Sequence, residues 1–189
     1  MPGSFRKPPP SDTDAARAEP RPGGPVGGVA IRLAVPGDGP AIAEVQRATW
    51  LATYHEWIPE AVAGLDPVRT AGNWARASRQ PGDRVALALV GGTIIGYAWS
   101  GPADERADGE LLALYVHPDA QRQGAGRLLL ADALAWMSAT GRVRCLVWAL
   151  ERHAPARRFY ERAGFALDEG HNRSWRGLTE IRYSRAVQA

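Results

Sequence analysis

The sequence predicts an α/β fold in which helices flank one mixed β-sheet. Two β-type runs, residues 85–90 and 93–100, are joined by a Gly-Gly pair, which is typical of an antiparallel hairpin. A strand at 110–116, a glycine-bearing loop, an amphipathic helix and a strand at 142–149 form a strand–helix–strand unit, so these two strands should be parallel with a right-handed crossover. A length of 189 residues and an apolar share of 45% fit a single domain with an ordinary core.

The N-terminal part divides at residue 29. Residues 1–28 are rich in proline and glycine and contain one aromatic residue, Phe5. Such a segment has too little apolar surface to offset its ordering entropy, so we expect a disordered tail. Residues 29–35 alternate in the manner of a first strand, and the folded domain is expected over 29–189.

Two helices should follow the first strand. Asp38 is expected to cap the first one with its carboxylate, and the apolar spacing continues to about Tyr54. Asp66 and Pro67 are a second start signal of the same kind, which leads into a helix over 68–79. We expect these two helices to lie side by side.

The remaining elements complete the sheet. Residues 110–116 are almost all apolar, which indicates a central strand covered on both faces. The helix that follows should end at Gly141, before the strand at 142–149. A last helix over 155–163 and a closing strand over 181–187 follow.

Composition and charge argue against several classes of protein. The net charge is +3, and basic residues alternate with acidic ones, so we expect no nucleic-acid partner. The single cysteine, Cys145, lies in an apolar run and excludes an internal disulfide or a cysteine-based metal cluster. No apolar stretch has the length of a membrane span and no secretory signal is visible, so a cytoplasmic protein with no membrane partner is expected.

The loop between the strand at 110–116 and its helix is suited to binding an anion. Its backbone N–H groups can converge beside the positive end of the helix, and its glycines allow close approach of a phosphate. It does not match a dinucleotide fingerprint or a Walker loop, and a Gly-x-Gly turn alone is often only a tight connection. The residues of this loop are Gln121, Arg122, Gln123, Gly124, Ala125 and Gly126.

The chain resembles the GNAT superfamily of N-acetyltransferases. Residues 121–126 match that family's acetyl-CoA motif at every fixed position, and residues 156–165, ARRFYERAGF, look like a second family segment. The resemblance covers roughly residues 29–187. It implies a mixed sheet with splayed central parallel strands and transfer of an acetyl group from the cosubstrate acetyl-CoA to a primary amine by direct attack in a ternary complex. Separately, His55, His117 and His171 have no carboxylate or cysteine partners at ligand spacing, so we expect no metal.

The resemblance also assigns contacts to acetyl-CoA. The backbone of Leu114, Tyr115 and Val116 would pair with the pantetheine arm, while residues 121–127, which end at Arg127, would wrap the pyrophosphate. The family often has an asparagine that binds pantetheine before the last helix. Here His153 stands at that position, and a histidine can also donate one hydrogen bond.

Two side chains are candidates for proton transfer. Glu110 occupies the position that provides a general base in some GNAT enzymes; the alternatives are a solvated carboxylate or one that binds the amine without taking its proton. Tyr160 matches the tyrosine that protonates the departing thiolate in many of these enzymes, although its spacing also fits a core aromatic residue.

The acceptor amine, from a small molecule or a peptide, should bind near the first helices. Aromatic rings and a carboxylate there can hold a cation, although the tryptophans can equally serve only to pack the helices. The candidate residues are Trp50, Tyr54, His55, Glu56, Trp57 and Trp175. Two alternatives are a module that binds acyl-CoA without turnover and a protein-interaction domain with an incidental Gly-x-Gly turn, and a homodimer is left open.

Overall fold

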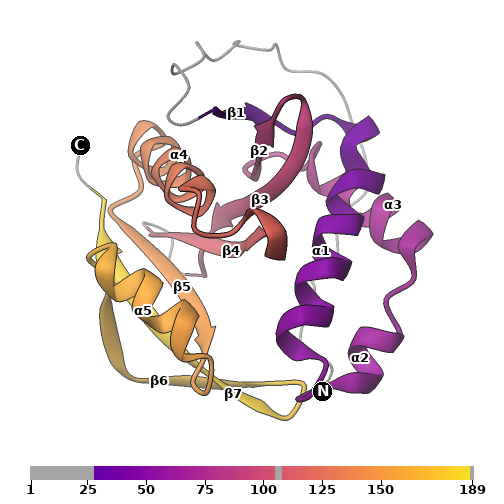
Figure 1. Ribbon diagram of the computed structural model, residues 1–189. Helices are drawn as coiled ribbons and strands as arrows, with labels where there is room; N and C mark the ends of the chain where they lie inside the picture. The colour runs from indigo at the N-terminus through magenta and orange to yellow at the C-terminus, as the bar shows by residue number, and fades with distance from the viewer. Residues whose placement is uncertain (1–27, 105–107, 188–189) are drawn as a thin grey trace.

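The computed structural model describes residues 28–104 and 108–187 as one mixed sheet with helices on both faces (Figure 1). The tail expected over residues 1–28 lies outside the described residues except for Gly28. The sheet has the order β1-β2-β3-β4-β5-β7-β6, and every neighbouring pair is antiparallel except β4 and β5. The strands are β1 (Val29–Leu33), β2 (Arg84–Val90), β3 (Thr93–Pro102), β4 (Asp108–Val116), β5 (Arg144–Leu150), β6 (Ala166–Trp175) and β7 (Leu178–Ala186).

The helices cover the two faces of the sheet unequally. In Figure 1, α4 and α5 lie on one face, while α1, α2 and α3 lie on the other. The α-helices are α1 (Gly39–Tyr54), α2 (Pro59–Ala63), α3 (Pro67–Ala77), α4 (Ala125–Ala139) and α5 (Ala154–Arg162), and short 3-10 turns cover Pro36–Asp38 and Pro118–Ala120. The predicted α/β fold with a mixed sheet is confirmed, and α4 makes the crossover between the parallel strands β4 and β5.

Alternation along β2 shows how the two faces form separate cores. Ala86 and Ala88 pack toward α4, together with Leu129 and Met137 of that helix. Val85, Leu87 and Leu89 point the other way, toward α1 and α3. Successive side chains of a strand alternate in direction, so one strand contributes to both layers.

The starts of the first two long helices differ from each other. Asp66 caps α3 as predicted, because its carboxylate accepts a hydrogen bond from the Arg69 N–H at 2.6 Å. The predicted cap at Asp38 is wrong: its carboxylate accepts from the Val35 N–H and pairs with the guanidinium of Arg32 at 2.6 Å. Because this carboxylate is bound by Arg32 and the Val35 N–H, it does not cap the amide groups of α1.

The predicted neighbourhood of α1 and α3 is confirmed by their shared core. Ile42 and Val45 of α1 pack with Trp74 of α3. The indole N–H of Trp74 donates to Gln46 Oε1 at 2.7 Å, which satisfies two buried polar groups at once. The two helices therefore form one layer over β2 and β3.

The sheet contains two hairpins with two-residue turns, β2–β3 and β6–β7. Gly91 and Gly92, between β2 and β3, have φ angles of 54° and 85°, as a two-residue hairpin turn requires. The second hairpin, β6–β7, turns at Arg176 and Gly177, with φ angles of 49° and 79°. Sequence analysis did not predict β6, because that strand is largely exposed and has no apolar alternation.

Candidate active site

A central cleft opens where β4 separates from its parallel neighbour. β4 pairs with β5 only from Asp108 to Leu111. The register between β3 and β4 shifts at the next residue, so Leu112 is an extra residue in β4 that has no partner in β3. Such a β-bulge bends the strand, and the second half of β4 diverges from β5. The cleft that results has a volume of about 1460 Å³.

The second half of β4 presents backbone groups to the cleft. The His117 N–H donates to the Ile95 carbonyl at 2.8 Å, so alternate residues of β4 bond to β3. Leu114 and Val116 lie between those residues, and their N–H and C=O groups therefore point away from β3. The Gln121 side-chain amide donates to the Val116 carbonyl at 3.2 Å, which confirms this direction. The family-based expectation of an exposed strand edge at residues 114–116 thus has a geometric basis.

The 121–127 loop lies at one end of this cleft and forms the entry to α4. Arg122 and Gly124 both have positive φ angles, 64° and 92°, which curl the backbone around its own N–H groups. The first helical bond that follows runs from the Arg127 N–H to the Gly124 carbonyl at 3.0 Å. Within residues 28–104 and 108–187, the N–H groups of residues 122–126 donate to no acceptor. These amides lie beside the positive end of a 15-residue helix, an arrangement suited to an anion.

The two glycines of the loop have different roles. A Cβ placed on Gly124 would meet no atom within 4 Å, so its positive φ is what restricts this position to glycine. A Cβ on Gly126 would contact the Phe159 ring at 3.6 Å, which is an ordinary van der Waals distance. The backbone conformation therefore requires glycine at position 124, whereas position 126 has room for a Cβ in contact with the Phe159 ring.

Glu110 lines the cleft at the point where the strands separate. Its side chain is 18% exposed, and Arg173 of β6 places a guanidinium nitrogen 4.0 Å from its carboxylate. The strand begins two residues before the predicted start, at Asp108, whose buried carboxylate pairs with Arg144 of β5 at 2.6 Å. That ion pair joins β4 to β5 immediately before they diverge.

Tyr160 of α5 lies against the opposite side of the cleft from α1. It is buried, and its ring packs edge-on against Phe159 and Phe165. Burial raises the pKa of Tyr160, so the phenol stays protonated, as a proton donor must. Cys145 is fully buried nearby, and burial raises the pKa of its thiol to about 12, which makes it an inert core residue.

His153 precedes α5 and also lines the cleft. Its imidazole contacts the rings of Tyr54 and Trp57, with centroid distances of 6.4 Å and 5.7 Å. Burial lowers the pKa of His153, so the neutral imidazole, with one N–H donor, is favoured near neutral pH.

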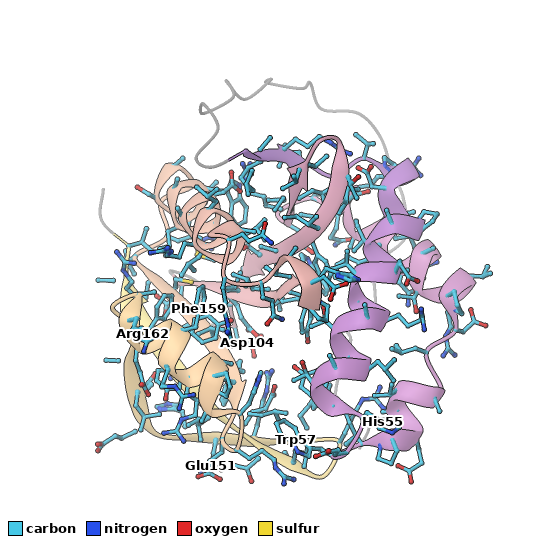
Figure 2. All side chains as sticks on the ribbon, viewed as in Figure 1. His55, Trp57, Asp104, Glu151, Phe159 and Arg162 are labelled. Carbon is cyan, nitrogen blue, oxygen red and sulfur yellow. The ribbon has the colours of Figure 1, made fainter. Side chains whose placement is uncertain are left out.

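Four of the six predicted acceptor residues form an aromatic cluster, which we define as Trp50, Tyr54, Trp57 and Trp175. Trp175 lies 5.7 Å from Trp50 and 5.9 Å from Tyr54 between ring centroids, and Tyr54 lies 6.1 Å from Trp57. Trp50, Tyr54 and Trp175 line the cleft. The other two predictions differ from the structure: His55 and Glu56 are exposed and do not line the cleft, and Figure 2 shows His55 beside α2.

The charged residues of this part of the cleft come from the hairpin that sequence analysis missed. Glu180 of β7 is paired with Arg173 of β6 at 2.6 Å, and Arg173 lies over the Trp148 ring at 4.3 Å. Glu180, whose charge acts on Tyr54, is therefore the carboxylate beside the aromatic cluster where Glu56 was expected. One signal was present in the sequence: Arg176-Gly177 separates two segments that can pair, as a two-residue turn does.

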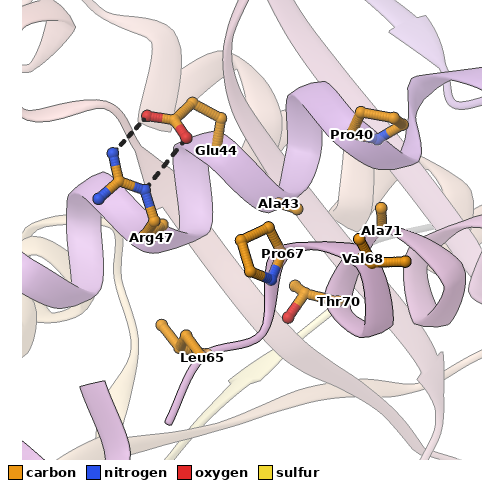
Figure 3. Close-up of a pocket in the computed structure, with 9 residues that line it drawn as sticks. All are labelled: Pro40, Ala43, Glu44, Arg47, Leu65, Pro67, Val68, Thr70 and Ala71. Atoms are coloured by element: carbon orange, nitrogen blue, oxygen red, sulfur yellow. Dashed lines mark hydrogen bonds and ion pairs between the residues drawn. The ribbon is translucent and has the colours of Figure 1, made fainter. Parts of the chain in front are cut away.

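A second, smaller hollow of about 300 Å³ lies between α1 and α3 (Figure 3). Its wall is largely apolar, and the two charged side chains at its edge, Glu44 and Arg47, are paired with each other at 3.0 Å. The described residues contain no group of three or more His, Cys, Asp or Glu side chains that could hold a metal ion; His117 and His171 each have one carboxylate neighbour. None of the helices in this same part of the chain is long and apolar enough to cross a membrane.

Comparisons with known proteins agree with this arrangement. The model of the acetyltransferase (GNAT) family matches residues 44–165. The uncharacterized N-acetyltransferase YuaI of Bacillus subtilis is 36% identical over 137 residues, which cover 70% of this chain and 78% of that protein.

Two solved structures show the same fold. The yncA protein of Salmonella typhimurium, solved with its cofactor acetyl-CoA, has a TM-score of 0.69 at 23% identity over 85% of this chain and 95% of its own. The PaiA N-acetyltransferase of Thermoplasma acidophilum, in complex with coenzyme A, has a TM-score of 0.67 at 21% identity over 82% of this chain and 97% of its own. The bulged strand, the free loop amides and the family match lead to one conclusion: the chain belongs to the GNAT family of acetyltransferases.

Proposed function

We propose that this protein is an N-acetyltransferase that moves the acetyl group of acetyl-CoA to a primary amine by direct attack in a ternary complex. The observation that carries the proposal is the coincidence of a bulged strand edge and the 121–127 loop at one cleft, where the N–H groups of residues 122–126 donate to no acceptor among the described residues. The strand edge suits an extended amide-containing arm, and the loop amides suit a pyrophosphate. Acetyl-CoA contains both groups in one molecule.

Each end of the cleft has residues for one part of acetyl-CoA. The backbone of residues 114–116 would pair with the pantetheine arm, and the imidazole N–H of His153 would add one hydrogen bond to it. The N–H groups of residues 122–126, with the guanidinium groups of Arg122 and Arg127, would hold the pyrophosphate. The presence of coenzyme A or acetyl-CoA in two structures of the same fold supports acetyl-CoA as the ligand.

Acetyl transfer to an amine needs a base, an oxyanion donor and an acid. An alkyl amine with a pKa near 10 is almost entirely protonated at neutral pH, so a proton must leave before the nitrogen attacks. Glu110 would accept this proton, directly or through water. The N–H group of Leu114 or Val116 would donate to the thioester oxygen as its negative charge develops, without reorganisation of the backbone. As the C–N bond forms and the C–S bond breaks, Tyr160 would give its proton to the departing sulfur, and the second proton that the attacking nitrogen loses would pass through water to restore the phenol.

A module that binds acyl-CoA without turnover is the second candidate function. It shares the loop and the strand edge with the enzyme and differs in needing neither Glu110 nor Tyr160. The position of Tyr160 and Glu110 in the lining of this cleft, where the enzyme would need an acid and a base, favours the enzyme. Release of free thiol in the presence of an amine distinguishes the two functions directly.

The experiment is a thermal melt with acetyl-CoA, followed by a thiol-release assay with a panel of amines. At 100 times the Kd, binding should stabilise the protein by about 2.7 kcal/mol. For a chain of this size, that stabilisation raises the Tm by about 5–10 °C. An unchanged Tm at millimolar acetyl-CoA, together with no thiol release, would contradict the proposal; a raised Tm without thiol release from any amine would favour the non-catalytic module.

A further inference from the structure

The β6–β7 hairpin contributes the charged wall of the cleft on the side of α1. Residues 173–177 and Glu180 line the cleft there, and Trp175 contacts the rings of Trp50 and Tyr54. The 121–127 loop and α5 lie at the other side, where phosphate groups are expected. The chemistry of the hairpin therefore bears on the acceptor rather than on acetyl-CoA.

The carboxylates of this wall already have a cationic neighbour. Arg173 donates to Glu180 at 2.6 Å and lies 4.0 Å from the carboxylate of Glu110. Its guanidinium is also stacked over the Trp148 ring at 4.3 Å, which fixes its position. An acceptor with several positive charges would meet two carboxylates that one arginine already compensates in part.

Arg176 adds a second positive charge at the turn of the hairpin. Within the described ranges 28–104 and 108–187, no carboxylate lies within ion-pair distance of it. Its guanidinium lies over the rings of Trp50 and Trp175, with centroid distances of 5.9 Å and 5.6 Å. The guanidinium therefore lies against Trp50 and Trp175, two members of the aromatic cluster that line the cleft.

The backbone of Arg176 adds an independent observation. Its φ angle is +49°, in a turn position where glycine or asparagine is the usual residue. Non-glycine residues with positive φ cost stability and gather at ligand-binding sites. The turn therefore places an arginine at the cleft in a conformation that a smaller residue would adopt more easily.

We propose that the acceptor is a primary amine that also carries a carboxylate, as an amino acid does. Arg176 binds the carboxylate, the ammonium group faces Glu110 and Glu180, and the apolar part of the acceptor packs on the aromatic cluster. This inference rests on the proposed acetyltransferase function and selects one class among its acceptors. It disfavours polyamines and other polycations, because Arg173 and Arg176 would repel them.

The test compares amines that differ only in the carboxylate. Thiol release is measured with saturating acetyl-CoA for the twenty standard amino acids and for matched amines that lack the carboxylate: phenethylamine against phenylalanine, agmatine against arginine, and cadaverine against lysine. Spermidine and a short peptide with a free N-terminus, an amidated C-terminus and no acidic side chain complete the panel. We expect kcat/KM to be at least tenfold higher for a carboxylate-bearing acceptor than for its matched amine.

Three variants assign the preference to Arg176. In Arg176→Asn, which accepts a positive φ but removes the charge, the KM for the preferred acceptor should rise at least tenfold while that for the matched amine stays within twofold. Arg176→Lys, which keeps the charge, should retain most of the preference. Arg79→Asn is the matched control: Arg79 is exposed, does not line the cleft, and should leave both kinetic constants unchanged.

The outcomes separate this inference from the proposed function. Equal or better turnover of the matched amines, of spermidine or of the peptide would overturn the inference and leave the acetyltransferase in place. Absence of turnover with every carboxylate-bearing amine would also overturn it. A protein that neither binds acetyl-CoA nor releases thiol with any acceptor would refute the proposed function itself.

Discussion

Replacement of Gly124 by valine tests whether the backbone of the 121–127 loop is the phosphate ligand. Gly124 has a φ of +92°, and no atom lies within 4 Å of the Cβ that valine would add. The substitution therefore acts only through the backbone: a β-branched residue at this φ costs about 1–3 kcal/mol. The loop either keeps its shape at that cost or relaxes and moves its free N–H groups away from the cleft.

The size of the binding effect follows from the hydrogen bonds at risk. Each N–H bond to a charged phosphate is worth about 1.5–3 kcal/mol, and 1.4 kcal/mol is a factor of ten in Kd. Displacement of a single amide should therefore weaken acetyl-CoA at least tenfold. The strain should also lower the Tm, by about 2–4 °C for each kcal/mol in a chain of this size.

Gly141 provides a matched control, because it ends α4 at the side away from the 121–127 loop. It also has a positive φ, +73°, and its Cβ would likewise meet no atom within 4 Å. Gly141→Val should lower the Tm by a similar amount and leave the Kd for acetyl-CoA unchanged.

Calorimetric titration with acetyl-CoA and with S-acetyl-pantetheine, which lacks the pyrophosphate, gives the answer. We expect Gly124→Val to weaken acetyl-CoA at least tenfold and S-acetyl-pantetheine less than threefold. Wild-type affinity for acetyl-CoA in a folded Gly124→Val protein, or an equal loss for both ligands, would show that the pyrophosphate does not bind these amides.

Three further predictions concern proton transfer, the N-terminal segment and pH. Tyr160→Phe should lower kcat at least a hundredfold and leave the Kd for acetyl-CoA unchanged, because the ring still packs while the proton donor is lost; equal kcat in steady-state assays would make Tyr160 a packing residue. Deletion of residues 1–28 should leave the Tm and the affinity for acetyl-CoA unchanged, and a fall of more than a few degrees in a thermal melt would show that the segment contacts the domain. The hydrogen bond from Arg32 lowers the pKa of Asp38, so this pair stabilises the fold above the unfolded-state pKa, and that contribution is lost as the pH falls through the folded-state pKa. Asp38→Asn should therefore lower the Tm at pH 7 but have little effect once the carboxyl is protonated, well below pH 4; an equal Tm difference at both pH values would contradict this assignment.

The fold was largely predictable because its central elements have strong local signals. The Gly91-Gly92 turn and the cap at Asp66 are determined by a few adjacent residues, and the structure shows both as predicted. The cap predicted at Asp38 failed because an arginine on the preceding strand binds the same carboxylate, and sequence spacing does not reveal that competition. The helix α2, five residues long, is too short to show a period.

The sequence placed several residues that line the cleft, among them Glu110, His153 and Tyr160, but it did not place the charged wall. The 121–127 loop could be found from its glycines and its place between strand and helix. The charged wall could not, because β6 is exposed on most of its length and lacks the apolar alternation that marks a strand. Without β6 there was no reason to place Arg173 or Arg176 beside the aromatic cluster. Adjacency to the tryptophans in sequence favours Glu56 as the acceptor-binding carboxylate, but its side chain is exposed outside the cleft.

The bulge at Leu112 gives β4 one residue more than the stretch of β3 that it pairs with, and this extra residue bends the strand away from β5. Before the bulge, Asp108 anchors the strand to β5; after it, Leu114 packs with the core under α4 and α5, while Tyr115 turns toward α1. Removal of Leu112 would leave these faces unchanged, because the pairs Leu111–Ser100 and Ala113–Trp99 would then follow each other in an ordinary antiparallel register. It would, however, remove the bulge that bends the second half of β4 away from β5. The shape of the cleft therefore depends more on the number of residues in β4 than on their identity. A conservative replacement within the strand can preserve the site, whereas deletion of Leu112 would leave an ordinary, unbulged strand.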